Sequence, residues 1–160
     1  MKFHSPMIIV ADIEKSKSFY TGVLNEAISL DLGGYVVMGG FAMMSRDTWR
    51  EQTKDDLVPE KGAARCFELY FEESMLDDFV AGLQKTDVGV FQALTEAPWG
   101  QRTVRLLDPD GHVVEVSEPM EEVVRRLLAS GMSPQEASEK TMMPVEFVTE
   151  CAAGRGKAGL

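Results

Sequence analysis

The chain has 160 residues, of which 44% are hydrophobic and 26% are charged. A chain of this length buries enough surface to fold without disulfides or a structural metal. Its 26 acidic and 16 basic residues give a net charge of −10 with histidine neutral. This negative charge disfavours binding to nucleic acid or to anionic lipid, because both are polyanionic surfaces that require basic patches.

Compartment signals point to the cytoplasm. No apolar run approaches the ~18 residues of a membrane-spanning helix, and no basic segment followed by an apolar stretch opens the chain. The two cysteines, Cys66 and Cys151, form no CxxC pair and are too few for a disulfide framework. We therefore expect a cytoplasmic protein without a membrane segment or a secretion signal.

The first 44 residues predict a strand, a helix and three further strands. An apolar run over 3–10 predicts a strand, and Asp12 is suited to cap the helix that follows. Apolar residues at helical spacing predict that helix over 13–24. Three short apolar runs separated by glycine pairs then predict three strands. These strands cover 27–32, 35–38 and 41–44.

The same order of elements is predicted again over 64–118. A polar stretch over 45–63, with a short helix around Trp49, links the two halves. Ser74 is suited to cap the helix of the second half, whose apolar face extends over 75–83. The sequence Asp-Pro-Asp-Gly over 108–111 predicts a tight turn before the last strand. The four predicted strands cover 65–71, 88–94, 102–107 and 112–116.

Helical patterns replace the strands from Pro119 onward. The first predicted helix runs over 120–128 and is stopped by Gly131. Ser133 and Pro134 are an N-cap and a first-turn proline for a second helix, and Pro144 opens a third. The chain therefore divides into a first module over 1–44, a linker over 45–63, a second module over 64–118, a helical extension over 119–151 and a disordered tail over 152–160.

The last two predicted helices faintly resemble a helix-turn-helix. Residues 119–150 carry six acidic and three basic side chains, however. A recognition helix rich in acids is implausible on a phosphate backbone. We expect the extension to pack on the sheet or on a second subunit and not to bind nucleic acid.

Two motifs carry a family resemblance. They are Asp-Ile-Glu-Lys-Ser over 12–16, leading to Phe19-Tyr20, and Asp-Pro-Asp-Gly-His over 108–112, leading to Glu115. With the two repeated modules, they resemble the vicinal oxygen chelate superfamily of glyoxalases, bleomycin resistance proteins and extradiol dioxygenases over 3–118. The resemblance implies an α+β fold in which two tandem βαβββ modules form a curled mixed sheet around a cleft, with a C-terminal helical extension.

The resemblance also implies a metal site. In the family a divalent metal often lies in the cleft, and the matching positions here are Glu68 and Glu115. The usual histidine of the first strand falls at Ser5, one residue after His4, which reaches the cleft only if that strand bulges. The fourth position falls near Met43 or Met44, poor ligands for hard cations. The implied cofactor is Zn, Mn, Fe, Ni or Mg held by Glu68, Glu115 and His4.

The residues themselves leave two interpretations of Glu68 and Glu115 open. Both are charged positions within apolar strands, where an unpaired carboxylate is costly. They either pair with an arginine on a neighbouring strand, Arg102 or Arg105, or enter one cleft that binds a metal or a polar ligand. Glu115 and Glu68 are our candidate catalytic residues.

The resemblance places further residues at the ligand. Trp99 would offer a stacking surface and Arg102 a fixed pair of donors. The alternative for this pair is edge packing and a salt bridge from Arg102 to Glu115. The other candidate lining residues, which are core residues by default, are Met43, Trp49, Phe67 and Tyr70.

Three functions remain open. The first is a metal-dependent lyase, isomerase or dioxygenase acting on a small organic molecule, although the missing histidines weigh against a glyoxalase I or an extradiol oxygenase. The second is a metal-free protein that binds or sequesters an organic ligand such as an antibiotic. The third is a ligand sensor that acts through its helical extension. Since dimers are common in the family, we expect a homodimer, with modules paired within one chain or swapped between two.

Overall fold

The computed structural model of the chain describes residues 4–54 and 67–154. These residues fall into two compact units. The first unit draws on Met1–Phe67 and also takes Leu107–His112 from later in the chain. The second draws on Glu68–Leu106 and Val113–Leu160. Each unit has its own four-stranded sheet.

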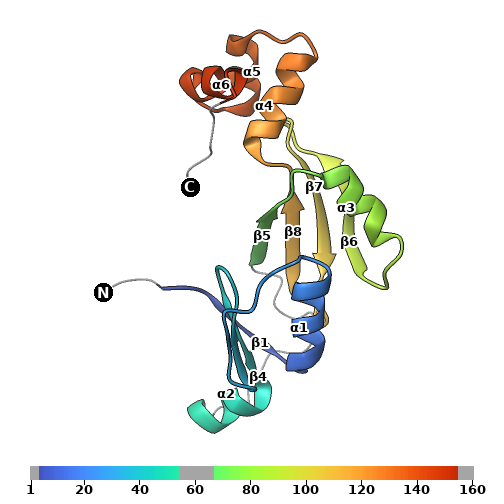
Figure 1. Cartoon of the computed structure of the whole chain (residues 1–160), viewed down its shortest axis with the longest axis vertical. Helices are drawn as coiled ribbons and strands as arrows, with labels where there is room; N and C mark the ends of the chain where they lie inside the picture. The colour runs from blue at the N-terminus through green and yellow to red at the C-terminus, as the bar shows by residue number, and fades with distance from the viewer. Residues whose placement is uncertain (1–3, 55–66, 155–160) are drawn as a thin grey trace. The chain divides into compact units, whose positions relative to one another are not determined.

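The first unit is the predicted βαβββ module followed by one more helix (Figure 1). Strand β1 pairs in parallel with β4, and the antiparallel pairs β4–β3 and β3–β2 complete the order β1-β4-β3-β2. Its elements are β1 (Met7–Val10), α1 (Ile13–Gly22), β2 (Leu30–Asp31), β3 (Tyr35–Val37), β4 (Ala42–Ser45) and α2 (Arg46–Thr53).

Helix α1 begins where the sequence predicts it. The carboxylate of Asp12 accepts hydrogen bonds from the backbone N–H groups of Glu14 and Lys15, both at 3.1 Å, which satisfies two of the free donors at the helix start. Phe19 and Tyr20, on one face of the helix, are buried. Met43 of β4 is fully buried as well. The core of this unit therefore lies between α1 and its sheet.

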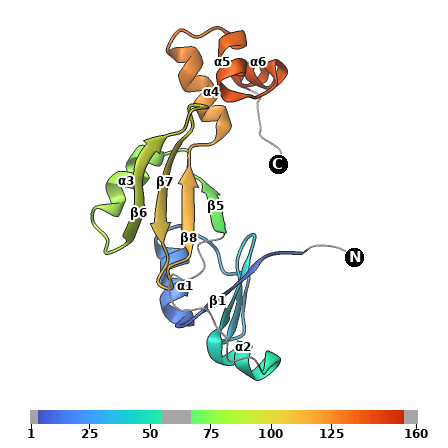
Figure 2. The same ribbon diagram turned by 180° about the vertical axis from the view of Figure 1, so that it is seen from behind.

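The second unit repeats the module. Its sheet has the order β5-β8-β7-β6, with β5 and β8 parallel (Figure 2). Its elements are β5 (Glu68–Glu72), α3 (Leu76–Leu83), β6 (Gly89–Glu96), β7 (Arg102–Leu107) and β8 (Val113–Ser117). The sequence prediction of two tandem modules is thus confirmed.

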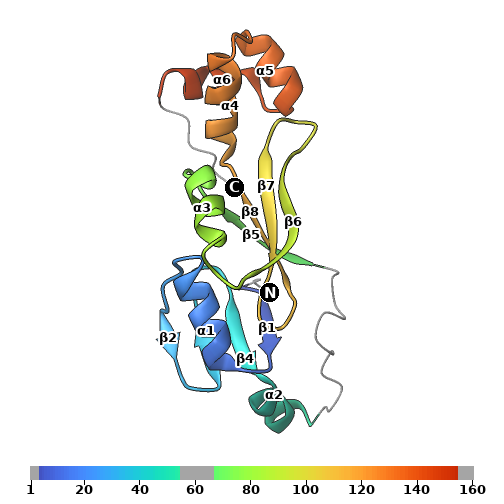
Figure 3. The ribbon, with the colours of Figure 1, turned by 90° about the vertical axis from the view of Figure 1, so that its right-hand side faces the viewer.

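The two faces of this second sheet differ in whether a described helix of the unit covers them. Helix α3 lies against one face of the sheet (Figure 3), and side chains alternate between faces along a strand, so one set of buried apolar side chains shares a single face of the sheet. This set comprises Leu69, Val104, Leu106, Val114 and Val116. No helix described in the second unit lies on the other face, which is turned to the viewer in Figure 2 and which we call the open face.

The start of α3 corrects one prediction. Ser74 does not cap this helix, which begins at Leu76 with Met75 at the N-cap position and no side-chain cap. Glu73 takes over part of the role, because its carboxylate accepts from the N–H of Met75 at 2.7 Å. The apolar periodicity located the helix, and the predicted N-cap is one residue too early.

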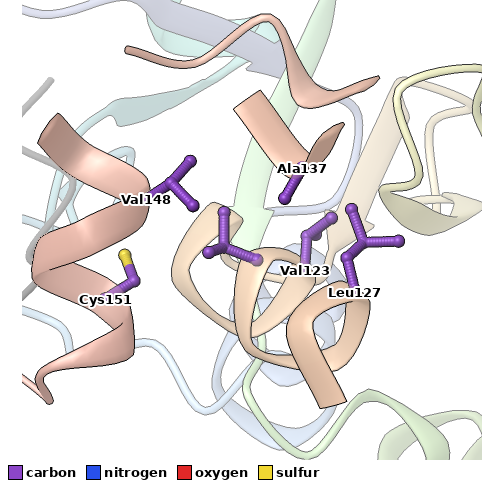
Figure 4. Close-up of a cluster of buried hydrophobic side chains, with 6 residues drawn as sticks. Val123, Leu127, Ala137, Val148 and Cys151 are labelled. Atoms are coloured by element: carbon purple, nitrogen blue, oxygen red, sulfur yellow. The ribbon is translucent and has the colours of Figure 1, made fainter. Parts of the chain in front are cut away.

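Three helices follow the second sheet: α4 (Met120–Ala129), α5 (Pro134–Thr141) and α6 (Val145–Ala152). Ser133 and Glu136 form a reciprocal capping box at the start of α5, and Gly131 adopts the left-handed φ of 99° that ends the α4 region. The predicted extension is therefore helical. Its core joins Val123, Val124 and Leu127 of α4 with Ala137, Val148 and Cys151 (Figure 4).

Some sequence predictions fall on residues outside the description. They are Phe3, the linker after Lys54, Cys66 and residues 155–160 of the predicted disordered tail. The predicted strand over 3–10 is shorter in the structure, because residues 4–6 are described but β1 begins only at Met7. Within the described residues, no helix has both the length and the apolar character needed to cross a bilayer.

Candidate functional site

Arg105 is the centre of the open face. Its Nε donates to Glu68 Oε2 on β5 at 2.9 Å, and its Nη1 donates to Gln92 Oε1 on β6 at 2.6 Å. Its Nη2 donates to Glu115 Oε2 on β8. One guanidinium on β7 thus joins side chains from the three other strands of its sheet. We call Glu68, Gln92, Arg105 and Glu115 the Arg105 cluster.

The two carboxyl groups of this cluster have opposite environments. Burial raises the pKa of Glu115, an effect that the Ser117 hydroxyl opposes by donating to Glu115 Oε1 at 2.8 Å. The Arg105 guanidinium lowers the pKa of the more exposed Glu68. Glu115 therefore holds a proton more readily than Glu68, and the pair combines a proton acceptor with a stable anion.

The donor set at this cluster does not fit a resident divalent metal. Glu68 and Glu115 both direct an oxygen at the Arg105 guanidinium, a cation that repels a second cation. Across residues 4–54 and 67–154, no three His, Cys, Asp or Glu side chains gather as a metal-binding group. His4 is exposed and belongs to the first unit. The chain therefore offers two carboxylates that are already paired, without an imidazole from the same unit.

A chain of hydrogen bonds lies at one edge of the open face. The indole Nε1 of Trp99 donates to Gln101 Oε1 at 3.1 Å, and Gln101 Nε2 donates to the Tyr70 hydroxyl at 3.0 Å. The Tyr70 hydroxyl donates in turn to Glu72 Oε1 at 3.1 Å. Burial, partly offset by the Gln101 hydrogen bond, raises the pKa of Tyr70 to about 12. Tyr70 and Trp99, both exposed in part, form what we call the aromatic edge.

Arg102 has partners other than Glu115. It donates to both oxygens of Asp77 on α3, at 3.0 and 3.1 Å, and pairs with Glu118 at 3.2 Å. The predicted alternative of an Arg102–Glu115 salt bridge is therefore wrong, and Arg105 is the partner of Glu115. Residues three apart on a strand point to opposite faces, so Arg102 and Arg105 cannot serve the same carboxylate.

The remaining predicted ligand residues belong to the first unit. Met43 is fully buried in its core, and Trp49 is half-buried on α2. Phe67 is exposed, and its ring centroid lies 5.9 Å from that of His112. Of the predicted residues, Glu68, Tyr70 and Glu115 come together on the open face, with Trp99 joined to Tyr70 through Gln101.

Four residues of the site were not named as site candidates from the sequence. Ser117 follows Glu115 by two positions, so strand alternation could have placed it on the same face. The sequence indicates Arg105 only as one of two possible salt-bridge partners of these carboxylates. Gln101 lies in the segment 98–102 that borders the cleft in the family, but its role, like that of Gln92, depends on which strands are neighbours in the sheet.

The Asp-Pro-Asp-Gly-His motif forms a buried turn within the first unit. One Asp108 oxygen accepts from the Tyr20 hydroxyl at 3.0 Å, and the other accepts from the N–H groups of Asp110 and His112. The ring Nδ1 of His112 lies 2.8 Å from Asp108 Oδ2. The Asp110 carboxylate accepts from the N–H of Ala11 at 3.0 and 3.1 Å. The motif thus joins the turn to α1 and to the end of β1.

Comparison with known proteins gives the same fold. The model of the Glyoxalase-like domain family matches residues 3–121, which leaves most of the helical extension outside the match. The crystal structure of a protein of unknown function from Agrobacterium tumefaciens str. C58 is 35% identical, covers 74% of this chain and 94% of its own, and has a TM-score of 0.67. No curated protein matches the chain significantly.

More distant structures share the fold. A glyoxalase/bleomycin resistance protein/dioxygenase from Nocardioides is 20% identical over 74% of this chain and 83% of its own, with a TM-score of 0.58. The fosfomycin resistance protein FosX from Mesorhizobium loti is 16% identical over 73% of this chain and 91% of its own, with a TM-score of 0.53. This chain belongs to the Glyoxalase-like domain family, within the vicinal oxygen chelate superfamily.

Proposed function

We propose that the chain binds a small organic ligand on the open face of its second sheet, between the Arg105 cluster and the aromatic edge, without a resident metal. The observation that carries this proposal is Glu115, a buried carboxylate on a sheet face that none of the described helices of its unit covers. A buried charge that only stabilised the fold could be replaced by apolar residues at little cost. Its position beside Arg105 and next to Tyr70 on the neighbouring strand favours a binding role.

The cluster also indicates what the ligand contacts. The Nε, Nη1 and Nη2 atoms of Arg105 already donate to acceptors within the chain. The face therefore offers a ligand mainly carboxylate oxygens and the Tyr70 ring. Glu68 and Glu72 are exposed on it. Val90 and Leu94 share a face with Gln92 by alternation and are also exposed. A ligand with hydrogen-bond donors and an apolar part would match this surface.

Relatives support a small-molecule ligand. The Nocardioides structure is described as a glyoxalase, bleomycin resistance protein or dioxygenase, and the Mesorhizobium loti structure as a fosfomycin resistance protein. Each name refers to chemistry on, or binding of, a small organic compound. These proteins share the fold of this chain at low identity, so they support the class of ligand and not its identity.

The test is a thermal-shift screen of a small-molecule library in the presence of EDTA. A ligand at 100 times its Kd adds about 2.7 kcal/mol to the stability of the folded state. We expect hits in EDTA, and we expect Glu115→Gln and Tyr70→Ala to lose the shift. Glu146→Gln, an exposed change on α6, is the matched control and should keep it.

Two outcomes would contradict this proposal. If every hit is lost in EDTA and returns with Zn²⁺ or Mn²⁺, Glu68 and Glu115 bind a metal after all, with Arg105 displaced. If the hits persist unchanged in Glu115→Gln and Tyr70→Ala, the ligand binds elsewhere on the chain.

A second candidate function is acid–base catalysis on the bound ligand. The observation that favours it is the raised pKa of Glu115 beside the lowered pKa of Glu68, since an acid–base residue works best when its pKa approaches the working pH. Glu115 would move a proton on the ligand while Arg105 orients both carboxyl groups. In that case Glu115→Gln would retain ligand binding and lose turnover, which separates catalysis from binding alone.

We further propose a homodimer in the cytoplasm. Strand β6 lies at the edge of its sheet and is exposed along its whole length. It carries Val90, Phe91 and Leu94. An exposed apolar edge strand favours pairing with another chain, and a second copy would cover it. Cys151 is a free, buried thiol, which agrees with a reducing compartment.

A further inference from the structure

We propose that Gln101 is a positioning residue that couples the aromatic edge to the helical extension α4–α6, so that a ligand on the open face alters the docking of the extension. This inference rests on the proposed ligand site and extends it to regulation. It assigns a role to helices that lie almost entirely beyond the family match, which ends at residue 121.

The side-chain amide of Gln101 lies at the centre of the coupling. Gln101 is buried, and its Oε1 accepts from Trp99. Its Nε2 donates to the Tyr70 hydroxyl at 3.0 Å and to the backbone carbonyl of Glu118 at 2.9 Å. A primary amide has two N–H donors, so both are in use. One serves the open face and the other serves Glu118, two residues before α4.

The hydrogen bonds at Tyr70 have a fixed direction. The hydroxyl has one proton, which it donates to Glu72, and it accepts from Gln101 with a lone pair. A ligand that binds Tyr70 or Glu72 changes this arrangement. The buried amide of Gln101 must then find another partner, because an unpaired buried donor is costly.

The other end of the coupling is the attachment of α4. The buried Glu118 carboxylate accepts from Arg126 of α4 at 3.0 and 3.2 Å and from Arg102 at 3.2 Å. Arg126 also donates to the carbonyl of Gly100. We call Gly100, Gln101, Arg102 and Glu118 the α4 junction. Gln101 is the residue of this junction that also contacts Tyr70.

Helices α4 and α5 both rest on the junction. A Cβ atom placed on Gly100 would lie 3.2 Å from Lys140 Cε of α5, 3.5 Å from Val123 Cγ1 and 3.6 Å from Leu127 Cδ1 of α4. Val123 and Leu127 also belong to the core of the extension. A shift of residues 100–101 would therefore move the side chains of α4 and α5 that lie against Gly100, and with Val123 and Leu127 it would disturb the core of the extension.

The test measures hydrogen exchange at the α4 amides of Val123, Val124 and Leu127 in the full-length chain. Local opening sets the exchange rate of such amides. We expect Tyr70→Phe to raise these rates about 5-fold, the lower end of ordinary allosteric coupling, because Gln101 loses a partner. Gln101→Leu should raise them at least as much. The double variant should match Gln101→Leu alone, since both changes act through one amide.

Tyr35→Phe, a matched loss of a hydroxyl in the first unit, should leave the rates unchanged. A second readout is the emission of Trp99 in a Trp49→Phe background. It should shift in both Tyr70→Phe and Gln101→Leu, because the indole N–H depends on Gln101. Gln101→Glu keeps the acceptor for Trp99 and removes both donors. Its Trp99 emission should therefore match that of the Trp49→Phe parent, while its α4 exchange rates should stay as high as those of Gln101→Leu.

The proposal is overturned if Tyr70→Phe leaves α4 exchange within about twofold of wild type, whatever Gln101→Leu does. Gln101 would then be only a structural part of the junction. If Gln101→Leu unfolds the second unit, the comparison of Tyr70→Phe with Tyr35→Phe still decides, because Tyr70 is partly exposed. None of these measurements uses a ligand, so their failure is distinct from failure of the proposed binding function.

Discussion

At the residue scale, Arg105 determines how this sheet face can carry charge. Glu68 and Glu115 come from neighbouring parallel strands, and without a cation between them they would repel each other. Arg105 pairs with both carboxylates through the rigid set of N–H donors of one guanidinium, which a lysine could not reproduce. The same residue shapes the chemistry of the face, since its guanidinium lies between the two carboxylates.

Replacing Arg105 should therefore destabilise the fold in a pH-dependent way. Breaking a buried ion pair costs about 3–5 kcal/mol, and we expect about 2 kcal/mol for Arg105→Gln because the cluster is partly exposed. Without the guanidinium, both carboxyl groups favour protonation in the folded state, so the loss should shrink as the pH falls toward the unfolded-state value of about 4.3. Urea unfolding near neutral pH and in mild acid measures the difference.

Arg125→Gln is the matched control for this experiment. Arg125 is exposed on α4 and pairs with Glu122 one turn away, a contact of the kind that contributes little. The free energy of unfolding of Arg125→Gln should stay within about 0.5 kcal/mol of wild type. An equal loss for Arg105→Gln at both pH values would show that packing, and not charge, explains the effect.

At the element scale, the attachment of the helical extension depends on a glycine and a glutamate. Gly100 adopts a φ of 89°, which side chains other than glycine adopt only with strain. It also leaves room for side chains of α4 and α5. Glu118, which follows β8, forms salt bridges with Arg102 of β7 and Arg126 of α4 and so links the sheet to α4. These two contacts make the extension part of the second unit.

Gly100→Ala should destabilise the chain by about 1–2 kcal/mol, because the new methyl group meets Lys140 and Val123 on a strained backbone. Gly82→Ala is the opposite control. Gly82 lies within α3 with nothing within 4 Å of a Cβ atom, so alanine should stabilise the helix by about 0.5–1 kcal/mol. Thermal unfolding of both variants tests the pair. Equal signs for the two substitutions would contradict the packing described at the junction.

Acid should loosen the extension through Glu118. Burial alone would raise the pKa of Glu118, but the guanidinium groups of Arg126 and Arg102 hold it below its ordinary value. A lowered folded-state pKa gives stability that is present above the unfolded value of about 4.3 and is lost as the pH falls through the folded value. The difference in unfolding free energy between wild type and Glu118→Gln should therefore be full near neutrality and vanish in acid.

The control for this experiment is Glu146→Gln on α6, an exposed carboxylate, for which the difference from wild type should stay small across the range. A Glu118→Gln variant whose deficit does not change between neutral pH and acid would mean that the ion pairs with Arg102 and Arg126 do not stabilise the docked extension.

At the scale of the whole molecule, the net charge of −10 and the exposed strand β6 bear on assembly. The charge keeps the chain soluble and slows non-specific association. The edge strand is exposed along its length and carries the apolar side chains of Val90 and Leu94. These two properties together favour one specific contact over general aggregation.

Light scattering after size-exclusion chromatography should give about twice the chain mass of 17.7 kDa. Val90→Lys should shift the mass toward that of one chain, because a charge on an edge strand blocks pairing. Met142→Lys, at a highly exposed position in the extension, is the control and should remain dimeric. A single-chain mass for wild type at all concentrations would exclude the dimer.

Much of the fold was accessible from local patterns. Asp12, Ser133 and Gly131 begin or end helices through contacts with their own neighbours, which is why their roles could be predicted. Ser74 shows the limit of the same reasoning. A cap acts at a single position, and apolar periodicity locates a helix only to within a residue or two.

By itself, the sequence determined two βαβββ modules and three further helices, because capping, turn chemistry and periodicity act over a few residues. The family followed from the resemblance of its two motifs and repeated modules to known proteins. The sequence also placed Glu68 and Glu115 in strands where an unpaired charge is costly. Only the tertiary structure decided that Arg105 and not Arg102 pairs with them, and that Gln101 joins Tyr70 to Glu118. Those contacts depend on which strands are neighbours in the sheet and on which face each side chain lies. The contacting residues are 10 to 37 positions apart in the chain, too far for local patterns to predict their pairing.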